Sequence, residues 1–216
     1  MNHNQVTISG RVADKCLYKY NRNGESYTVC LLESEYFCYN KIKRPKVKIS
    51  VPDKLASQTK ISEGVYIQIE GSLINNHHNW QTDIAVLAHK ISYSTPWEMA
   101  VDSVTLSGIV RKVITDESNF SSFVNFILSI KDTDALSRDI TVRVIVWGKL
   151  AYSLYGTLYE GDHITVTGSL NTMENAYGIL SSEVYCTSVE MGERDDIMTE
   201  ELFASLCEGD PLASSY

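Results

Sequence analysis

An internal repeat constrains the fold of this 216-residue chain more than any other feature of its sequence. Four short strings occur twice in the same order, and the second copies follow the first at offsets of 98, 95, 97 and 97 residues. Unrelated strands do not keep register in this way, so the sequence predicts a duplicated module of about 95 residues. The four pairs are VTISG at 6–10 with VTLSG at 104–108, KLA at 54–56 with 149–151, EG at 63–64 with 160–161, and GSL at 71–73 with 168–170.

The boundary between the two copies is expected near Ser94–Trp97, where Pro96 follows the last strand of the first copy. We therefore expect module one at residues 1–97 and module two at residues 98–192. Residues 193–216 are strongly acidic and form a C-terminal tail, which is either flexible or a short partner-docking helix.

Each module shows five segments with the alternation of extended chain, and a short helical segment between the third and the fourth. That order is typical of the OB-fold, a five-stranded Greek-key barrel, so the expected fold class is all-β with two tandem OB-folds. Residues 21–24, NRNG, predict a hairpin turn, and Pro52 is expected in the first turn of the helix. The expected strands are 6–12, 27–32, 46–51, 65–73 and 83–91, followed by 104–113, 123–130, 140–147, 163–170 and 180–189.

The net charge of −8 argues at first against a nucleic-acid partner, because phosphate binding needs local positive potential. The charge is unevenly distributed, however. Module one carries 12 basic and 8 acidic residues, module two carries 6 and 12, and the tail carries 1 and 7. Module one is therefore the better candidate for binding an anion, and the tail for binding a basic partner.

No motif for catalysis or for a cofactor is found. The five cysteines are scattered and lack a CxxC spacing, so we expect buried thiols rather than disulfides or a zinc site. Phosphate-binding loops, HExxH and GxSxG are missing, which predicts that the protein is not an enzyme. His77 and His78 point to opposite faces of a strand and suit a polar hairpin better than a metal site. With no signal peptide or apolar run of about 18 residues, we expect a cytoplasmic protein that does not associate with membranes.

Aromatic and basic side chains are interleaved in module one. This mixture suits single-stranded nucleic acid, because bases stack on aromatic rings and phosphates attract cations. The densest part is YFCYNKIKRPKVK at 36–48, for which a solvated basic loop is the alternative interpretation. The candidate binding residues in this module are Tyr18, Tyr20, Arg22, Tyr27, Tyr36, Phe37, Tyr39, Lys41, Lys43, Arg44, Lys46, Lys48 and Trp80.

In module two, the expected strand at 142–147, VRVIVW, has one face of small apolar residues and another that carries an arginine and an indole. Trp147 is either a core or rim residue or a platform for base stacking, and the sequence leaves both interpretations open. Arg143, Trp147, Lys149 and Tyr177 are the candidate binding residues of this module.

Residues 144–170 resemble the core signature of bacterial single-stranded DNA-binding proteins. In that family an aromatic residue precedes Gly-Lys-Leu-Ala, and a later Gly-Asp turn leads to a strand that ends in Gly-x-Leu. The opening strand at 104–110 also fits. Module one matches more loosely, because Pro52-Asp53 replaces the aromatic-glycine pair. The matching strings of module two are WGKLA at 147–151, GD at 161–162 and GSL at 168–170.

The resemblance implies binding of single strands by base stacking and backbone neutralisation, without catalysis or a cofactor. By the family pattern Trp147 stacks a base, and Tyr36 occupies the place of a second aromatic residue. Trp80 and Tyr177, each nine residues past their glycine, occupy the place of a third. Module two has no aromatic residue at the place of Tyr36.

We therefore expect a protein that binds single-stranded DNA without strong sequence preference in replication, recombination or repair. The family assembles four OB-folds, so two per chain make a homodimer attractive. The tail resembles the family's partner-recruiting tail in charge, which suggests replication or repair proteins as partners, but it lacks a compact acidic run closed by an aromatic residue. The alternative is an OB-fold protein-interaction adaptor of a mobile-element or phage replication complex, which the net acidity favours.

Overall fold

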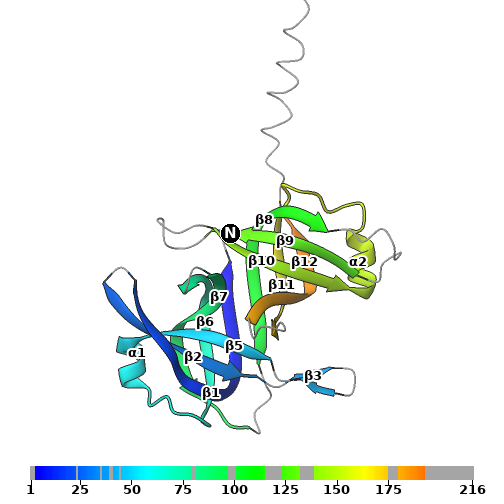
Figure 1. Cartoon of the computed structure of the whole chain (residues 1–216). Coiled ribbons are helices and arrows are strands. Elements are labelled where there is room, and N and C mark those ends of the chain that lie inside the picture. Colours follow the sequence, from blue (N-terminus) through cyan, green and yellow to red (C-terminus); the bar gives the residue numbers. More distant parts are fainter. Residues whose placement is uncertain are drawn as a thin grey trace, which may run out of the picture.

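The structure is a computed structural model, and it describes residues 3–22, 24–34, 36–38, 41–43, 45–78, 81–96, 101–114, 123–131, 139–174 and 180–192. Within these ranges the chain forms two five-stranded barrels (Figure 1), which confirms the expected all-β fold. The acidic tail at 193–216 lies outside the described residues. None of the helices in the described ranges is long and apolar enough to cross a membrane.

The first barrel is closed by its first and fourth strands. Its strands pair in the order β1–β2–β5–β7–β6, with β6 returning to β1, and the β5–β7 pair is parallel as the OB topology requires. A separate two-stranded sheet, β3–β4, is inserted between β2 and β5. The elements are β1 (Asn4–Arg22), β2 (Glu25–Glu33), β3 (Tyr36–Cys38), β4 (Lys41–Lys43), β5 (Lys46–Pro52), α1 (Asp53–Gln58), β6 (Tyr66–His78) and β7 (Gln81–Tyr93).

The second barrel repeats this order. Its strands pair as β8–β9–β10–β12–β11, with β11 returning to β8 and a parallel β10–β12 pair. Its helix α2 again connects the third strand to the fourth. The elements are β8 (Asp102–Ile114), β9 (Phe123–Ile130), β10 (Ile140–Trp147), α2 (Gly148–Leu154), β11 (His163–Glu174) and β12 (Leu180–Met191).

Strand alternation builds the core of each barrel. On β5, Val47, Ile49 and Val51 are buried, whereas Lys46 is exposed and Lys48 half-buried on the other face. In the repeated Glu-Gly turn, Gly64 and Gly161 have φ angles of 83° and 92°, a left-handed conformation that glycine adopts at little cost. The repeated strings are therefore structural positions of one barrel design.

The two barrels join through their first strands. β1 and β8 pair antiparallel, and Val6 lies opposite Val104, its own equivalent in the repeat. Flanking hydrogen bonds repeat across this pair, because Ser9 N donates to Val101 O and Ser107 N donates to His3 O, both at 2.7 Å. The two barrels are therefore related by an approximate two-fold axis at this strand pair. The pairing of β1 with β8 joins their strands into one continuous ten-stranded sheet.

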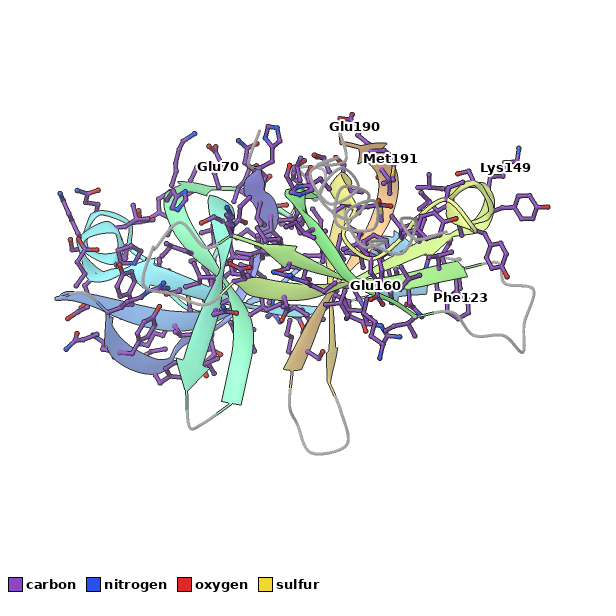
Figure 2. All side chains as sticks on the ribbon, turned by 90° about the horizontal axis from the view of Figure 1, so that it is seen from above. Glu70, Phe123, Lys149, Glu160, Glu190 and Met191 are labelled. Carbon is purple, nitrogen blue, oxygen red and sulfur yellow. The ribbon has the colours of Figure 1, made fainter. Side chains whose placement is uncertain are left out.

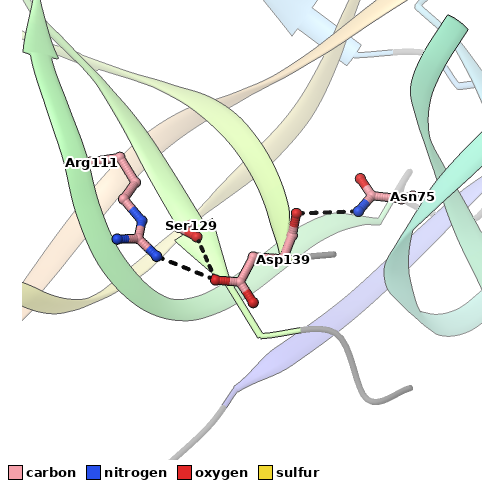
Figure 3. Close-up of polar contacts among 4 residues, drawn as sticks. All are labelled: Asn75, Arg111, Ser129 and Asp139. Atoms are coloured by element: carbon pink, nitrogen blue, oxygen red, sulfur yellow. Dashed lines mark hydrogen bonds and ion pairs between the residues drawn. The ribbon is translucent and has the colours of Figure 1, made fainter. Parts of the chain in front are cut away.

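A second contact between the barrels involves Asp139, which immediately precedes β10 (Figure 3). Its main-chain oxygen accepts a hydrogen bond from Asn75 Nδ2 of β6 at 3.2 Å. Its Oδ2 atom accepts from Ser129 Oγ of β9 at 3.1 Å and pairs with Arg111 Nη2 of β8 at 3.4 Å. The far end of the β6–β7 hairpin is thereby tied to three strands of the second barrel.

Some local expectations were wrong. β1 extends ten residues past the expected end at residue 12, and its last part pairs with β2 through two register shifts. Pro52 ends β5 and is the N-cap of α1, so it is not in the first helical turn. Cys30 and Cys186 are buried free thiols as expected, but Cys16 is exposed.

Candidate nucleic-acid interface

The outer face of β1, β2 and β5 gathers several predicted binding residues of the first barrel. Residues directly opposite each other on neighbouring strands share a face. Tyr18 lies opposite Val29 and Tyr20 opposite Tyr27, while Val29 in turn lies opposite Ser50. The other predicted residues on this face are Arg22, opposite Glu25, Lys46, opposite Glu33, and Lys48, opposite Leu31.

Two tyrosines of this face stack on each other. The rings of Tyr20 and Tyr27 are 5.2 Å apart and inclined by 14°. The Tyr20 hydroxyl and Ser50 Oγ are 2.6 Å apart, and the Tyr27 hydroxyl donates to Glu25 Oε2 at 2.9 Å. Burial, followed by the bond to Glu25 and its charge, raises the pKa of Tyr27 to about 12. Tyr27 is only 9% exposed, so most of the aromatic surface that this pair presents to solvent belongs to Tyr20.

Several predicted residues cannot be placed. Tyr36 and Lys43 are opposite each other in the β3–β4 sheet, and Cys38 lies opposite Lys41. This sheet leaves the barrel at the end of β2 and rejoins it at β5 (Figure 1). Outside the described part of the chain lie the side chains of Tyr36, Phe37, Lys41 and Lys43, and all atoms of Tyr39, Arg44, Trp80 and Tyr177.

In the second barrel, Trp147 is a rim residue with half of its surface exposed. It ends β10, its ring centroid is 5.0 Å from that of Phe123, and 50% of its surface is accessible. Lys149 follows in the first turn of α2 and is exposed. In Figure 2 the Lys149 side chain projects away from the barrel, at the end of the molecule opposite α1. An exposed indole edge beside a cation can stack a base and contact its phosphate.

Arg143 is held by an acidic partner. Its Nη1 atom is 3.2 Å from Oε1 of Glu183, which lies opposite it on the parallel neighbour β12. The Glu183 side chain is only 6% exposed. This pair offsets the charge of the predicted cation, so Arg143 contributes less positive potential than the sequence suggests.

Three tyrosines that the sequence analysis did not select are strongly exposed in the second barrel. Tyr152 of α2 is 83% exposed, and Tyr155 and Tyr159, which follow the helix, are 64% and 53% exposed. The equivalents of Tyr152 and Tyr155 in the first barrel, counted from the shared KLA string, are Ser57 and Lys60. The signal that could have found them is the i, i+3 spacing of Tyr152 and Tyr155 on the polar side of a short helix.

No group of three or more potential metal ligands is found among the described residues. The described strand surfaces present aromatic rings, hydroxyl groups and cations, together with the carboxylates of Glu25 and Glu33.

Comparison with solved structures finds the same architecture. The chain is similar to a deletion mutant of the single-stranded DNA binding protein from Thermus aquaticus, with a TM-score of 0.70 and 18% identity over 90% of this chain and 96% of that chain. The wild-type Thermus protein gives a TM-score of 0.70 and 17% identity over 89% and 94%. This likeness confirms the tandem OB-fold. No family model and no curated protein matches the sequence.

Proposed function

We propose that this protein binds single-stranded DNA without strong sequence preference, by base stacking and neutralisation of the backbone. The observation that carries the proposal is the outer face of β1, β2 and β5, where Tyr18 and Tyr20 lie with Lys46 and Lys48. In OB-folds the face of the second and third strands is the surface that binds oligonucleotides. The structural neighbours from Thermus are named as single-stranded DNA binding proteins, which supports this choice among the functions an OB-fold can serve.

The two barrels are proposed to contribute unequally. The first, residues 1–97, carries a net charge of +4 and holds most of the strand. The second, residues 98–192, carries −6, and Arg143 is already paired with Glu183. Its contribution is Trp147 with Lys149 at one end of the molecule. The cellular process is replication, recombination or repair, and the assembly is a homodimer, for which a monomeric mass in light scattering would be the contrary result.

Titration with oligo-dT tests the function directly. The chain has three tryptophans, and stacking on Trp147 or Trp80 is expected to quench their fluorescence at low salt. The logarithm of the binding constant should fall with that of the salt concentration at a slope of about −0.7 for each neutralised phosphate. An unchanged spectrum, with no binding in an electrophoretic mobility assay at low salt, would exclude single-strand binding.

Variants of single aromatic residues divide the binding energy between the barrels. A Trp147→Ala variant is expected to weaken oligo-dT binding about tenfold, since one stacked base contributes about 1–3 kcal/mol. A variant with both Tyr36→Ala and Trp80→Ala should weaken it further. Tyr152→Ser, which introduces the residue found at the equivalent position of the first barrel, is the matched control and should leave the affinity unchanged. A larger loss for Trp147→Ala than for the double variant would make the second barrel the principal binder.

A protein-interaction adaptor is the second candidate function, and the exposed tyrosines of the second barrel favour it. Tyr152, Tyr155 and Tyr159 are more than half exposed in an acidic module. Tyrosine is enriched in protein interfaces because its ring buries apolar area while its hydroxyl keeps a polar partner. If oligo-dT does not bind, this function becomes the better explanation of the fold.

A further inference from the structure

The first barrel contains an open hollow of about 580 Å³ where β2, β5, β7 and the start of α1 meet. Its volume lies within the range of roughly 300–1,000 Å³ that is usual for small-molecule sites. Five of its lining residues are apolar or aromatic, and six are polar or charged. The lining residues are Glu25, Ser26, Tyr27, Pro52, Asp53, Lys54, Leu55, Gln58, Leu87, Ala88 and His89.

A comparison with the equivalent positions of the second barrel shows why this space is open. Tyr27 lies opposite Pro52, and at the equivalent place Phe123 lies opposite Trp147. The indole of Trp147 packs against Phe123 there, whereas Pro52 places only its small aliphatic ring opposite Tyr27. A second difference acts in the same direction. Leu87 lies opposite Ser72 of the repeated GSL string, and the residue opposite the corresponding Ser169 is Tyr185. Two aromatic side chains of the second barrel are thus replaced by smaller ones.

The walls of the hollow suit an uncharged aromatic ring. Tyr27 is fixed on one side by its stack with Tyr20 and by its hydrogen bond to Glu25. Leu87 adds a half-buried aliphatic wall, and His89 is positioned by a contact of 3.2 Å between its Nε2 atom and Ser72 Oγ. Aromatic and aliphatic walls are typical of sites that hold flat organic rings, and polar residues beside such walls fix the orientation of the ring.

The two carboxylates of the hollow disfavour a phosphate in its interior. Glu25 accepts a hydrogen bond from the Tyr27 hydroxyl, and Asp53 accepts one from Thr28 Oγ1 at 3.0 Å. These two carboxylates repel an anion at close range. Lys54 lines the rim and is exposed, so a phosphate attached to a ring inside the hollow would meet a cation outside it.

We infer that this hollow is a nucleobase pocket, in which one base of a bound single strand occupies the space that the Trp147 indole fills in the second barrel. This inference rests on the proposed function and adds to it an asymmetry between the barrels. The first barrel takes a base between Tyr27, Pro52 and Leu87. The second fills the same place with its own indole and leaves only an exposed edge for stacking.

The inference is tested by a variant that fills the pocket with the larger side chain found at the equivalent position of the second barrel. Leu87→Tyr introduces the residue found at position 185, and it is expected to weaken oligo-dT binding about fivefold or more, because a stacked base is lost. The matched control, Tyr185→Leu, makes the reverse change in the second barrel and should leave oligo-dT affinity within twofold of the wild type. Circular dichroism verifies that both variants keep the β-fold.

A second measurement uses the wild-type protein and thymidine 5′-monophosphate. In ¹H–¹⁵N NMR spectra, the amide shifts of Tyr27, Leu87 and His89 should move on titration, and those of Phe123 and Tyr185 should not. Oligo-dT binding that is unchanged by Leu87→Tyr, or mononucleotide shifts that avoid these three amides, would overturn the pocket and leave the proposed function intact. A wild-type protein that does not bind oligo-dT at all would refute the function itself.

Discussion

Replacing Gly168 with alanine is expected to lower the free energy of unfolding by about 3 kcal/mol or more, which is a large part of the stability of a small domain. Gly168 lies at a register shift of the β11–β12 ladder. A Cβ atom at this position would collide with the carbonyl oxygen of Tyr185 on β12. The obstacle is main chain in a closed barrel, so neither a rotamer change nor a small local shift can relieve it.

Urea unfolding measures this effect, with Gly156→Ala as the matched control. Gly156 has a φ angle of 75°, and a Cβ atom there would meet no heavy atom within 4 Å. Alanine at Gly156 therefore costs only the left-handed conformation, about 1–2 kcal/mol. Equal losses in the two variants would show that the close contact at Gly168 is relaxed in solution.

The same contact explains why the repeat could be detected in the sequence. Gly71, the equivalent of Gly168, also lies at a register shift, and its Cβ atom would collide with the carbonyl oxygen of Leu87. Positions that only glycine can occupy stay recognisable when the strands around them differ. The five strands of each barrel, the place of the helix and the bounds of β9 and β10 followed from such positions and from simple alternation.

The end of β1 and the β3–β4 sheet could not be predicted in this way. Residues 13–22 of β1 lie largely on the surface, and the register shifts at Asp14 interrupt the alternation of buried and exposed positions. β3 and β4 have only three residues each. Residues 13–22 add little to the buried core that produces the period-2 signal, and strands of three residues are too short to show such a signal.

For the candidate interface, the sequence indicates which residues of one strand share a face, but not which residues of other strands they contact. Alternation alone places Tyr18 with Tyr20, and Lys46 with Lys48, on common faces. The ion pair of Arg143 with Glu183 depends on the parallel register of β10 and β12, which are separated by a helix and another strand. Long-range register of this kind is visible only in the folded structure.

The seam between the barrels also contains side-chain contacts that depend on long-range strand register. Asn4 and Asp102 occupy equivalent positions on the approximate two-fold axis, since Asn4 lies opposite Leu106 and Asp102 opposite Ile8. The Asn4 amide makes two hydrogen bonds to the main chain of Leu73, because Nδ2 donates to Leu73 O at 2.9 Å and Oδ1 accepts from Leu73 N at 2.8 Å. Asn4 therefore satisfies both its donor and its acceptor.

Asp102 repeats only half of this arrangement. Its Oδ1 atom accepts from Leu170 N at 2.8 Å, but its buried Oδ2 atom has no hydrogen-bond partner within the described ranges. Burial raises the pKa of Asp102 from 3.8 to about 6, even though the Leu170 N–H favours the charged form. A protonated carboxyl can donate a hydrogen bond as the Asn4 amide does, whereas a carboxylate cannot.

The sign of the pH dependence follows from this raised pKa. Between pH 3.8 and about 6 the folded protein binds the Asp102 proton more tightly than the unfolded chain does. The stabilisation is therefore present in full below pH 3.8 and is lost as the pH rises through about 6. At 1.36 kcal/mol per pKa unit, the difference is at most about 3 kcal/mol. Above pH 6 the charged Asp102 remains a fixed cost to the folded state.

An Asp102→Asn variant should therefore be more stable than the wild type at pH 7.5, by about 2–3 kcal/mol in urea unfolding, because the amide supplies the missing donor without a charge. The gain should shrink as the pH falls from 6.5 to 4, where the wild-type carboxyl becomes protonated. The mirror variant, Asn4→Asp, should introduce a second group of the same kind and lose a similar amount at pH 7.5 but not at pH 4. A constant difference between Asp102→Asn and the wild type over this pH range would show that Asp102 does not titrate in the seam. The expected pair of results, a gain in stability for Asp102→Asn and a loss for Asn4→Asp at pH 7.5, would show that the seam needs a hydrogen-bond donor at both equivalent positions.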